Sequence, residues 1–324
     1  MLVRHRGSGQ LYALKSVHKQ WVLAFNQLAH AQSERAILAR FRESFNVAPT
    51  GAAGRGRLDC FLVRMHATFQ SATELFYVLD FHAGGDLAAV LGQQVRLGEG
   101  AARFYAAEIV TGLQLLHQRH VIYRDLKPEN VLLDVEGHVV LTDFGLSTWT
   151  AAGGEGGGQG RTVCGTAEYL APEIVLGQAC GPGVDLWSLG VMLYEMLAGT
   201  VPFESESSFG LLMKHLNEPP PSIVGISSDL QAVIDRALSK EPAFRYPSAT
   251  ALVDEFIGVF NGQTVSLDTI TQLKIARQAQ EKPRGFVLPA WLTPSILRVS
   301  LVILVVAFLL AFVASSFFKK SRNT

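Results

Sequence analysis

The stretch Tyr123-Arg124-Asp125-Leu126-Lys127-Pro128-Glu129-Asn130 decides the fold of this chain, together with Asp143-Phe144-Gly145 thirteen residues after Asn130. Short apolar runs border both motifs: Val131-Leu132-Leu133 follows the first, and Val139-Val140-Leu141 precedes the second. One polar motif of three residues, found alone, would indicate no more than a polar turn between two strands. Two polar motifs in this order, each beside a strand-like run, indicate a site that carries chemistry.

The composition limits the class of protein. The 324 residues suffice for one large domain or two smaller ones, and 28 basic residues balance 28 acidic ones. Without a basic field, nucleic acid is not expected as a partner. The cysteines (Cys60, Cys164 and Cys180) are odd in number and lack metal-ligand spacing, which argues against a disulfide framework or a zinc site.

Hydrophobic periodicity divides the chain near residue 80. Before it, strand patterns surround one helix, and after Gly84-Gly85 the pattern becomes mostly helical. A polar loop over 46–57 and a Gly-rich tract over 151–160 interrupt these elements. The expected strands are Leu11–Val17 and Leu75–Leu79, and the expected helices are 27–41 (with Leu28, Ala31, Ile37 and Leu38 at helical spacing), Ala101–His117 and Asp185–Ala198.

The segment Val299–Phe318 contains no charged residue and is almost wholly apolar. Its twenty residues would span roughly 30 Å as a helix, the thickness of a bilayer core. Arg298 and Lys319-Lys320 bracket it, and an end segment that is apolar all round is seldom a buried core helix. The sequence therefore predicts a juxtamembrane linker over 261–295, a transmembrane helix over 296–318 and a short tail over 319–324.

Long motifs around these elements resemble the catalytic domain of a Ser/Thr protein kinase of the AGC type. They are Tyr123 at the head of the first stretch, the run Leu141–Ser147, and the run Thr162–Glu173. The residues near 211–256 and the membrane segment are similar instead to bacterial membrane-anchored (Hanks-type) kinases. The resemblance implies an α+β, bilobal fold, with an antiparallel sheet plus helix over 1–82 and a mainly helical lobe over 83–260.

The resemblance also implies an activity, the transfer of the γ-phosphoryl group of Mg-ATP to protein Ser or Thr hydroxyls. Asp125 would accept the proton of the substrate hydroxyl, and Lys127 would neutralise charge on the phosphoryl group. Asn130 and Asp143 would supply the hard oxygen ligands that magnesium prefers.

Further positions match the ATP site of the family. Lys15 would bind the α- and β-phosphates and pair with Glu34, although either residue alone would be an ordinary surface charge. The hinge whose backbone binds adenine would be Asp80-Phe81-His82, with Leu79 as gatekeeper. Ala13 and Leu132 would enclose the two faces of the base.

Other matches concern the C-terminal lobe. Thr166 would position the substrate hydroxyl near Asp125 and Lys127. Glu173 and Arg245 would form a buried ion pair, and Asp185 would hold the backbone of the catalytic loop. We expect these last three residues to be structural.

One departure from the family is serious, because Met1–Arg4 already resembles the strand that follows the Gly-rich turn over the phosphates. Gly7-Ser8-Gly9 falls in the next turn. We expect that Met1 is not the true start of the protein and that the Gly-rich turn lies upstream of it. The alternatives are a pseudokinase that acts as a scaffold at the membrane, and a small-molecule kinase on the same fold.

Three acidic positions, Asp86, Glu129 and Glu195, match those that bind Arg upstream of the target hydroxyl in basophilic AGC kinases. They predict a preference for upstream Arg, although each could also be a solvated surface charge.

Regulation is expected at Arg124, which immediately precedes Asp125. Its guanidinium would have no partner of opposite charge until a phosphate group on the chain binds to it. Thr162 is the expected phosphorylated residue, modified in trans by self-association. His30, one helical turn before Glu34, would bind the same phosphate or would simply be exposed.

The expected topology is a single-pass membrane protein whose kinase domain is cytoplasmic, because ATP is cytoplasmic. The flanking charges on the two sides of Val299–Phe318 are balanced, so the positive-inside rule favours neither orientation. The expected partners are protein substrates and the lipid bilayer.

Overall fold

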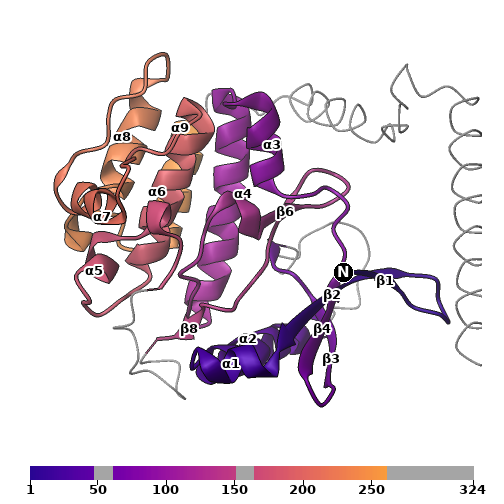
Figure 1. Ribbon diagram of the computed structural model, residues 1–324. Helices are drawn as coiled ribbons and strands as arrows, with labels where there is room; N and C mark the ends of the chain where they lie inside the picture. The colour runs from indigo at the N-terminus through magenta and orange to yellow at the C-terminus, as the bar shows by residue number, and fades with distance from the viewer. Residues whose placement is uncertain (47–60, 151–163, 261–324) are drawn as a thin grey trace, which may run out of the picture. The chain divides into compact units, whose positions relative to one another are not determined.

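The computed structural model describes residues 1–46, 61–150 and 164–260 (Figure 1). All of these residues belong to the first of the two compact units into which the chain divides, Met1–Lys274. Within this unit a sheet with two helices comes first in the chain, and a mainly helical part follows. The predicted order of a sheet-containing lobe followed by a mainly helical lobe is confirmed.

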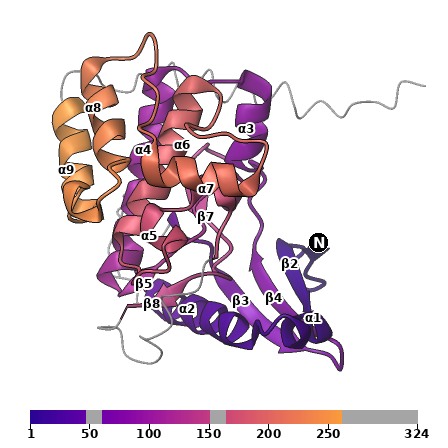
Figure 2. The same ribbon diagram turned by 60° about the vertical axis from the view of Figure 1, so that its left-hand side comes forward.

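The N-terminal lobe is a four-stranded antiparallel sheet in the order β1-β2-β4-β3. Figure 2 shows helix α2 beside β3 and β4. The Gly7-Ser8-Gly9 turn joins β1 to β2, as expected. The elements are β1 (Leu2–Arg4), β2 (Leu11–His18), α1 (Lys19–Ala24), α2 (Leu28–Asn46), β3 (Met65–Gln70) and β4 (Glu74–Asp80).

The long pairing of β2 with β4 places Lys15 in the middle of the sheet. Lys15 lies opposite Tyr77, and Ala13 lies opposite Leu79. Tyr77 and Leu79 alternate along β4 and are both buried, as the period of a strand with one buried face requires. The predicted strand Leu11–Val17 is present as β2, which continues one residue further to His18 because its pairing with β4 extends as far as Glu74.

The sequence predicted one helix in this lobe, and the structure contains a second, α1. This helix has six residues and buries only Val22, so it presents no apolar stripe that periodicity could reveal. In α2 the predicted positions Ile37 and Leu38 are buried, whereas Leu28 in the first turn is 48% exposed.

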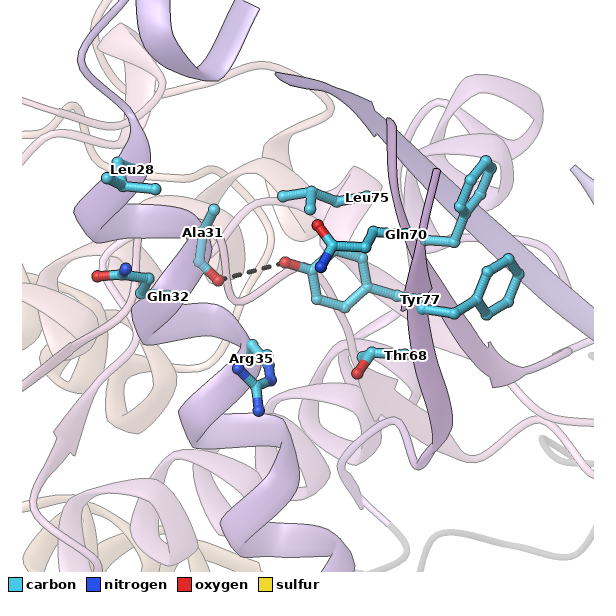
Figure 3. Close-up of a pocket in the computed structure, with 10 residues that line it drawn as sticks. Leu28, Ala31, Gln32, Arg35, Thr68, Gln70, Leu75 and Tyr77 are labelled. Atoms are coloured by element: carbon cyan, nitrogen blue, oxygen red, sulfur yellow. Dashed lines mark hydrogen bonds between the residues drawn. The ribbon is translucent and has the colours of Figure 1, made fainter. Parts of the chain in front are cut away.

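A pocket of about 400 Å³ lies between α2 and strands β3 and β4 (Figure 3). At its wall the hydroxyl of Tyr77 donates a hydrogen bond to the carbonyl oxygen of Ala31 at 3.2 Å, which ties α2 to the sheet. The residues labelled around it are Leu28, Ala31, Gln32 and Arg35 of α2 and Thr68, Gln70, Leu75 and Tyr77 of the strands. This attachment helps to fix the helix that carries Glu34.

The C-terminal lobe is built around α6 (Gly183–Ala198), which buries nearly every residue it contains. A helix that is apolar on all sides belongs in the interior, and α4 and α8 pack against it. The other helices are α3 (Leu87–Gln94), α4 (Glu99–Gln118), α5 (Pro172–Val175), α7 (Ser208–Asn217), α8 (Ser228–Ala237) and α9 (Ala249–Phe260).

Short strands carry the motifs at the boundary between the lobes. The predicted runs form β6 (Val131–Leu133) and β7 (Val139–Leu141), which pair with each other, and β5 (Val121–Ile122) pairs with β8 (Thr148–Trp149). A backbone hydrogen bond of 2.9 Å from Val63 N to the Leu141 carbonyl connects the segment before β3 to β7. These contacts place both sequence motifs where the two lobes meet.

Among the residues that the structure describes, no helix is both long enough and apolar enough to cross a bilayer. The predicted linker, the transmembrane helix over 296–318 and the tail lie outside the described residues.

Candidate active site

One carboxylate of α6 holds the backbone of the loop from Tyr123 to Asn130. Asp185 is fully buried and accepts hydrogen bonds from the backbone N–H groups of Tyr123 (2.9 Å) and Arg124 (2.8 Å). The Nε2 atom of His117 lies 2.7 Å from the same carboxylate. Arg124 has a φ angle of 65°, which is rare for a residue with a side chain. The central helix therefore holds the loop backbone through Asp185, which makes the contact that the sequence predicted.

Asp125, Lys127 and Thr166 come together at the mouth of this loop. The Nζ atom of Lys127 donates to Thr166 Oγ1 at 2.8 Å and lies 3.5 Å from Asp125 Oδ2. The Thr166 hydroxyl lies 3.3 Å from Asp125 Oδ1. An acceptor, a cation and a hydroxyl therefore converge from two segments that are distant in sequence. This group can receive a proton and neutralise a developing negative charge.

Asn130 completes the group from the following turn, Pro128–Asn130. Its amide nitrogen donates to the backbone carbonyl (2.8 Å) and to Oδ2 (2.9 Å) of Asp125. Because the nitrogen is occupied, the amide oxygen is left for another ligand. Asn130 thus orients Asp125 and keeps a hard oxygen available.

Lys15 connects the two lobes through two carboxylates. Its Nζ atom lies 2.6 Å from Glu34 Oε1 on α2 and 2.8 Å from Asp143 Oδ1 after β7. Burial alone would lower the pKa of Lys15, but the two carboxylates outweigh it and raise this pKa. The predicted pair of Lys15 with Glu34 is present, and Asp143 joins it.

The two carboxylates respond differently to the same lysine. Burial raises the pKa of Glu34, and the charge of Lys15 offsets only part of this rise. Burial also acts to raise the pKa of Asp143, but the Lys15 charge and the Gly145 backbone N–H bring it below its usual value. Asp143 therefore stays ionised, and its side chain is about half exposed, at 46%.

Asp143 and Asn130 were predicted to bind magnesium. No cluster of three or more His, Cys, Asp or Glu side chains suited to a metal ion occurs within the described ranges. An ionised, accessible carboxylate and an available amide oxygen nevertheless suit magnesium, which takes few protein ligands and completes its shell with water and phosphate oxygens. The donor set therefore fits a nucleotide-bound magnesium ion.

The predicted adenine region lies at the connection between β4 and α3. Leu79 is buried, whereas Ala13 and Leu132 are partly buried against the core. The chain crosses β6 at Gly84, where a Cβ atom would lie 2.1 Å from the Leu133 carbonyl oxygen, so only glycine fits. This close crossing positions the hinge segment.

Some polar groups of the predicted hinge residues already have partners within the protein. The backbone N–H of Asp80 donates to the Arg64 carbonyl at 3.0 Å, and the Asp80 carboxylate lies 2.5 Å from Nε2 of His66. His66 was not among the predicted site residues, because it is an isolated histidine in β3 and belongs to no motif. His82 is partly buried; burial lowers its pKa, and its Nε2 atom has no hydrogen-bond partner in the described structure.

The Arg124 side chain is buried, and only some of its N–H groups have hydrogen-bond partners in the described structure. Its Nε atom donates to the Leu146 carbonyl at 2.7 Å, whereas one terminal nitrogen is buried without a hydrogen-bond partner in the described part of the chain. Burial lowers the pKa of His30, and the positive charge of Arg124 lowers it further. Thr162 and the Gly-rich tract lie outside the described residues.

Of the three predicted acidic positions, two interact electrostatically, Glu129 and Glu195. Glu195 on α6 accepts a hydrogen bond of 2.6 Å from the Tyr169 hydroxyl. Burial raises the pKa of Glu195, and the charges of Glu129 and Glu168 raise it further. Glu168 was missed, although it sits in a quoted motif. Asp86 instead caps α3, where its carboxylate accepts from Ala89 N at 2.8 Å.

Glu173 and Arg245 form a bidentate ion pair with both contacts at 2.7 Å. Both side chains are almost completely buried. Arg245 also donates to the carbonyl oxygens of Gly183, Ser239 and Lys240. The pair ties the segment after Thr166 to the helical lobe, as the sequence predicted.

Comparisons with known proteins agree with this geometry. Residues 1–257 match the family model described as the protein kinase domain. The chain is 37% identical over 253 residues to Protein kinase 3 of Dictyostelium discoideum, covering 76% of this chain and 26% of that protein. It is 38% identical over 246 residues to Serine/threonine-protein kinase YPK1 of Saccharomyces cerevisiae, covering 76% and 33%.

A third relative is Serine/threonine-protein kinase Sgk1 of Gallus gallus, 40% identical over 241 residues, with 74% of this chain and 52% of that protein covered. The chain thus spans about a quarter to a half of the length of these curated relatives. Their similarity confirms the predicted resemblance to Ser/Thr kinases of the AGC type. On the match over residues 1–257, this chain belongs to the protein kinase domain family.

Proposed function

We propose that this chain is a Ser/Thr protein kinase that transfers the γ-phosphoryl group of ATP to protein hydroxyls. The observation that carries the proposal is the convergence of Asp125, Lys127 and Thr166 within hydrogen-bond reach of one another. This group has an acceptor for the hydroxyl proton and a cation for the phosphoryl group, which are the parts that phosphoryl transfer requires.

In this proposal each residue has one task. Asp125, oriented by the Asn130 amide, accepts the proton of the substrate Ser or Thr. Thr166 holds the substrate hydroxyl next to Asp125, and Lys127 stabilises negative charge on the transferred group. Because phosphoryl transfer is catalysed mainly by positioning and charge, the hydrogen bonds among these residues are the source of rate acceleration.

The nucleotide would be held by the residues between the lobes. Asn130 and Asp143 would hold magnesium, which would supply positive charge to neutralise the phosphates of ATP. Lys15, kept protonated by Glu34 and Asp143, would contact the α- and β-phosphates. The backbone around Asp80 and His82 would orient adenine between Ala13 and Leu132.

The second candidate is a pseudokinase scaffold. The observation that favours it is that the Gly7-Ser8-Gly9 turn connects β1 to β2, one connection later than the Gly-rich turn expected over the phosphates. The assembled Lys15–Glu34–Asp143 contacts favour the kinase, because a scaffold has no need of a lysine held between two carboxylates.

Measuring Mg-ATP binding and phosphate transfer in parallel separates the two candidates. The full chain should bind Mg-ATP and phosphorylate Ser or Thr in a protein substrate, and Lys15→Met should abolish transfer. Lys19→Met is the matched control, because in the described structure the ammonium of that lysine contacts the Ser71 carbonyl in the turn between β3 and β4. Nucleotide binding without transfer by the wild-type chain would favour the scaffold.

We further propose that the substrate carries Arg upstream of the target hydroxyl. What supports this is the closeness of Glu129 to Glu195, whose raised pKa reflects burial and acidic neighbours that a guanidinium would relieve. Asp86 contributes less in this proposal, since one of its carboxylate oxygens is occupied in capping α3.

Regulation by phosphorylation of Thr162 is proposed from Arg124. A buried guanidinium that has no hydrogen-bond partner for one terminal nitrogen among the described residues, and whose charge lowers the pKa of His30, is suited to receive a phosphate. Thr162→Ala should lower turnover far more than Mg-ATP affinity. Full turnover of this variant, in protein extended upstream by a Gly-rich strand pair, would exclude the proposal.

Anchoring in a membrane is proposed from the sequence alone. The uncharged run Val299–Phe318 supports a single-pass protein, and the need for cytoplasmic ATP favours a cytoplasmic kinase domain. In intact cells an N-terminal tag should be protected from external protease and a C-terminal tag digested, and the reverse pattern would refute this topology.

A further inference from the structure

His66 is the extra residue of a β-bulge in β3. In the pairing of β3 with β4, Met65 lies opposite Leu79 and Ala67 lies opposite Val78, so His66 has no counterpart in the register of these two strands. A bulge bends its strand and re-aims the side chain of the extra residue, and bulges are frequent beside active sites. The bulge therefore gives His66 a direction that regular pairing would not give it.

The His66 side chain reaches Asp80, the last residue of β4 and the first of the predicted hinge. Its Nε2 atom lies 2.5 Å from Oδ1 of the Asp80 carboxylate. Because a carboxylate accepts hydrogen bonds, Nε2 is the donor. The His66 side chain is 28% exposed and that of Asp80 is 34% exposed, so the contact is partly shielded from water. It ties the end of β4 to β3 where the chain leaves the sheet.

Tyr12 completes a row of three side chains across the sheet. Its ring lies edge-on to that of His66, with centroids 4.8 Å apart and an interplanar angle of 71°. Tyr12 also lies opposite Asp80 in the pairing of β2 with β4. Because β4 runs between β2 and β3, Tyr12, Asp80 and His66 come from three adjacent strands. The aromatic contact and the hydrogen bond together restrict the orientation of the His66 ring.

The backbone of Asp80 can offer a nucleotide its carbonyl oxygen but not its N–H group. The N–H already donates to the Arg64 carbonyl oxygen at 3.0 Å. A carbonyl oxygen accepts, and the donor on the edge of adenine is the 6-amino group. Leu79 is buried, and side chains alternate along a strand, so the Asp80 side chain lies on the other face of the sheet. The carboxylate can therefore influence the base only through the backbone.

We infer that His66 is a positioning residue for the adenine base, an inference that rests on the proposed ATP site. Its hydrogen bond to the Asp80 carboxylate fixes the orientation of Asp80, and with it the carbonyl oxygen that accepts from the 6-amino group. His66 itself touches neither the base nor the phosphates. Because a hydrogen bond weakens steeply when its angle is wrong, loss of His66 affects nucleotides that carry the 6-amino group and spares those that lack it.

The test compares two nucleotides on the full chain. Equilibrium dissociation constants are measured for Mg-ATP and for the magnesium complex of purine riboside 5′-triphosphate, which lacks the 6-amino group. His66→Phe keeps an aromatic ring beside Tyr12 and removes the donor to Asp80. It should weaken Mg-ATP binding by about threefold to tenfold, the range of one hydrogen bond, and leave the analogue within about twofold. An equal loss for both nucleotides, or no loss for either, would overturn the inference.

His18 offers the matched control on the same sheet. Its Nε2 atom lies 4.0 Å from Glu74 at the far end of the pairing of β2 with β4. His18→Phe should leave both dissociation constants unchanged, and a loss of Mg-ATP affinity equal to that in His66→Phe would contradict a specific role for His66. His66→Gln, whose amide can still donate to Asp80, should recover most of the lost Mg-ATP affinity.

A second variant tests whether His66 acts through Asp80. The double variant His66→Phe with Asp80→Ala should bind Mg-ATP no more than about twofold more weakly than Asp80→Ala alone, because the two changes remove one contact. Fully additive losses would overturn the inference. A wild-type chain that binds neither nucleotide would refute the proposed function as well, whereas normal Mg-ATP binding by His66→Phe would refute the role of His66 alone.

Discussion

Lys15 and Asp143 lie 2.8 Å apart, although 128 residues separate them in the chain. The lysine comes from the middle of the N-terminal sheet and the aspartate from the end of β7, so this contact joins the two lobes. Glu34 on α2 holds the lysine from the other side at 2.6 Å. The position of α2 therefore determines whether the ammonium can face a nucleotide held by Asp143.

The first prediction concerns Glu34→Gln, which keeps the shape of the side chain and removes its charge. A charge-assisted hydrogen bond to a buried group is worth about 1.5–3 kcal/mol, so kcat/KM for Mg-ATP should fall by roughly tenfold to a hundredfold. Steady-state kinetics against ATP would check this. Arg35→Gln at the next position on α2 is the matched control, and an equal loss there would show that charge on the helix matters in general.

The second prediction concerns the buried pair of Glu173 and Arg245. Removing one partner leaves an uncompensated buried charge, so Glu173→Gln should lower the free energy of unfolding by about 3–5 kcal/mol. Denaturant unfolding measures this change. The exposed pair of Arg236 with Glu255 offers the comparison, since Glu255→Gln should cost less than about 1 kcal/mol. Similar losses at the two sites would contradict our interpretation of the buried pair.

The third prediction concerns acid stability. Burial and the charge of Lys240 lower the pKa of His215 to about 4, so between about pH 4 and pH 6.5 the unfolded chain binds a proton that the folded chain does not. Stability should therefore fall as pH drops through this window, by about 2 kcal/mol from this residue at about pH 5. His215→Phe fills the same place between the rings of Trp187 and Phe203 and should lessen the loss between about pH 7 and pH 5. An unchanged pH dependence in the variant would exclude His215 as the cause.

The fourth prediction concerns selection of upstream Arg. If Glu129 and Glu195 bind a guanidinium, peptides with Arg before the target hydroxyl should be preferred, and Glu129→Ala should reduce this preference by about tenfold or more. A peptide-array profile before and after the substitution checks this. Glu136→Ala, in the turn between β6 and β7, should leave the profile unchanged. Indifference of the wild-type chain to upstream Arg would refute the proposal.

Local motifs explain what the sequence could predict. The strands around Asp125 and Asp143 and the helices α4 and α6 follow from apolar runs that are visible in the chain. The pairings of Lys15 with Glu34 and of Glu173 with Arg245 were implied by the resemblance to AGC kinases. Helix α1 was missed because only Val22 among its residues is buried. A six-residue helix with one buried side chain leaves no periodic signal.

Contacts between isolated residues could not be predicted. His66 meets Asp80 only because β3 and β4 pair side by side. The charge of Glu129 acts on Glu195 although the two residues lie far apart in the sequence. Thr162, the transmembrane helix and the similarity to bacterial kinases stay predictions.

The central claim is tested most directly by single-turnover phosphate transfer with Asp125→Asn. A general base contributes about a hundredfold to ten-thousandfold to the rate, so the variant should lose that factor in the transfer step. Its Mg-ATP affinity should stay within about twofold of the wild type, since Asp125 is not a proposed nucleotide ligand. A transfer rate in the Asn variant equal to that of the wild-type chain would contradict the assignment of Asp125, Lys127 and Thr166 as the site of phosphoryl transfer.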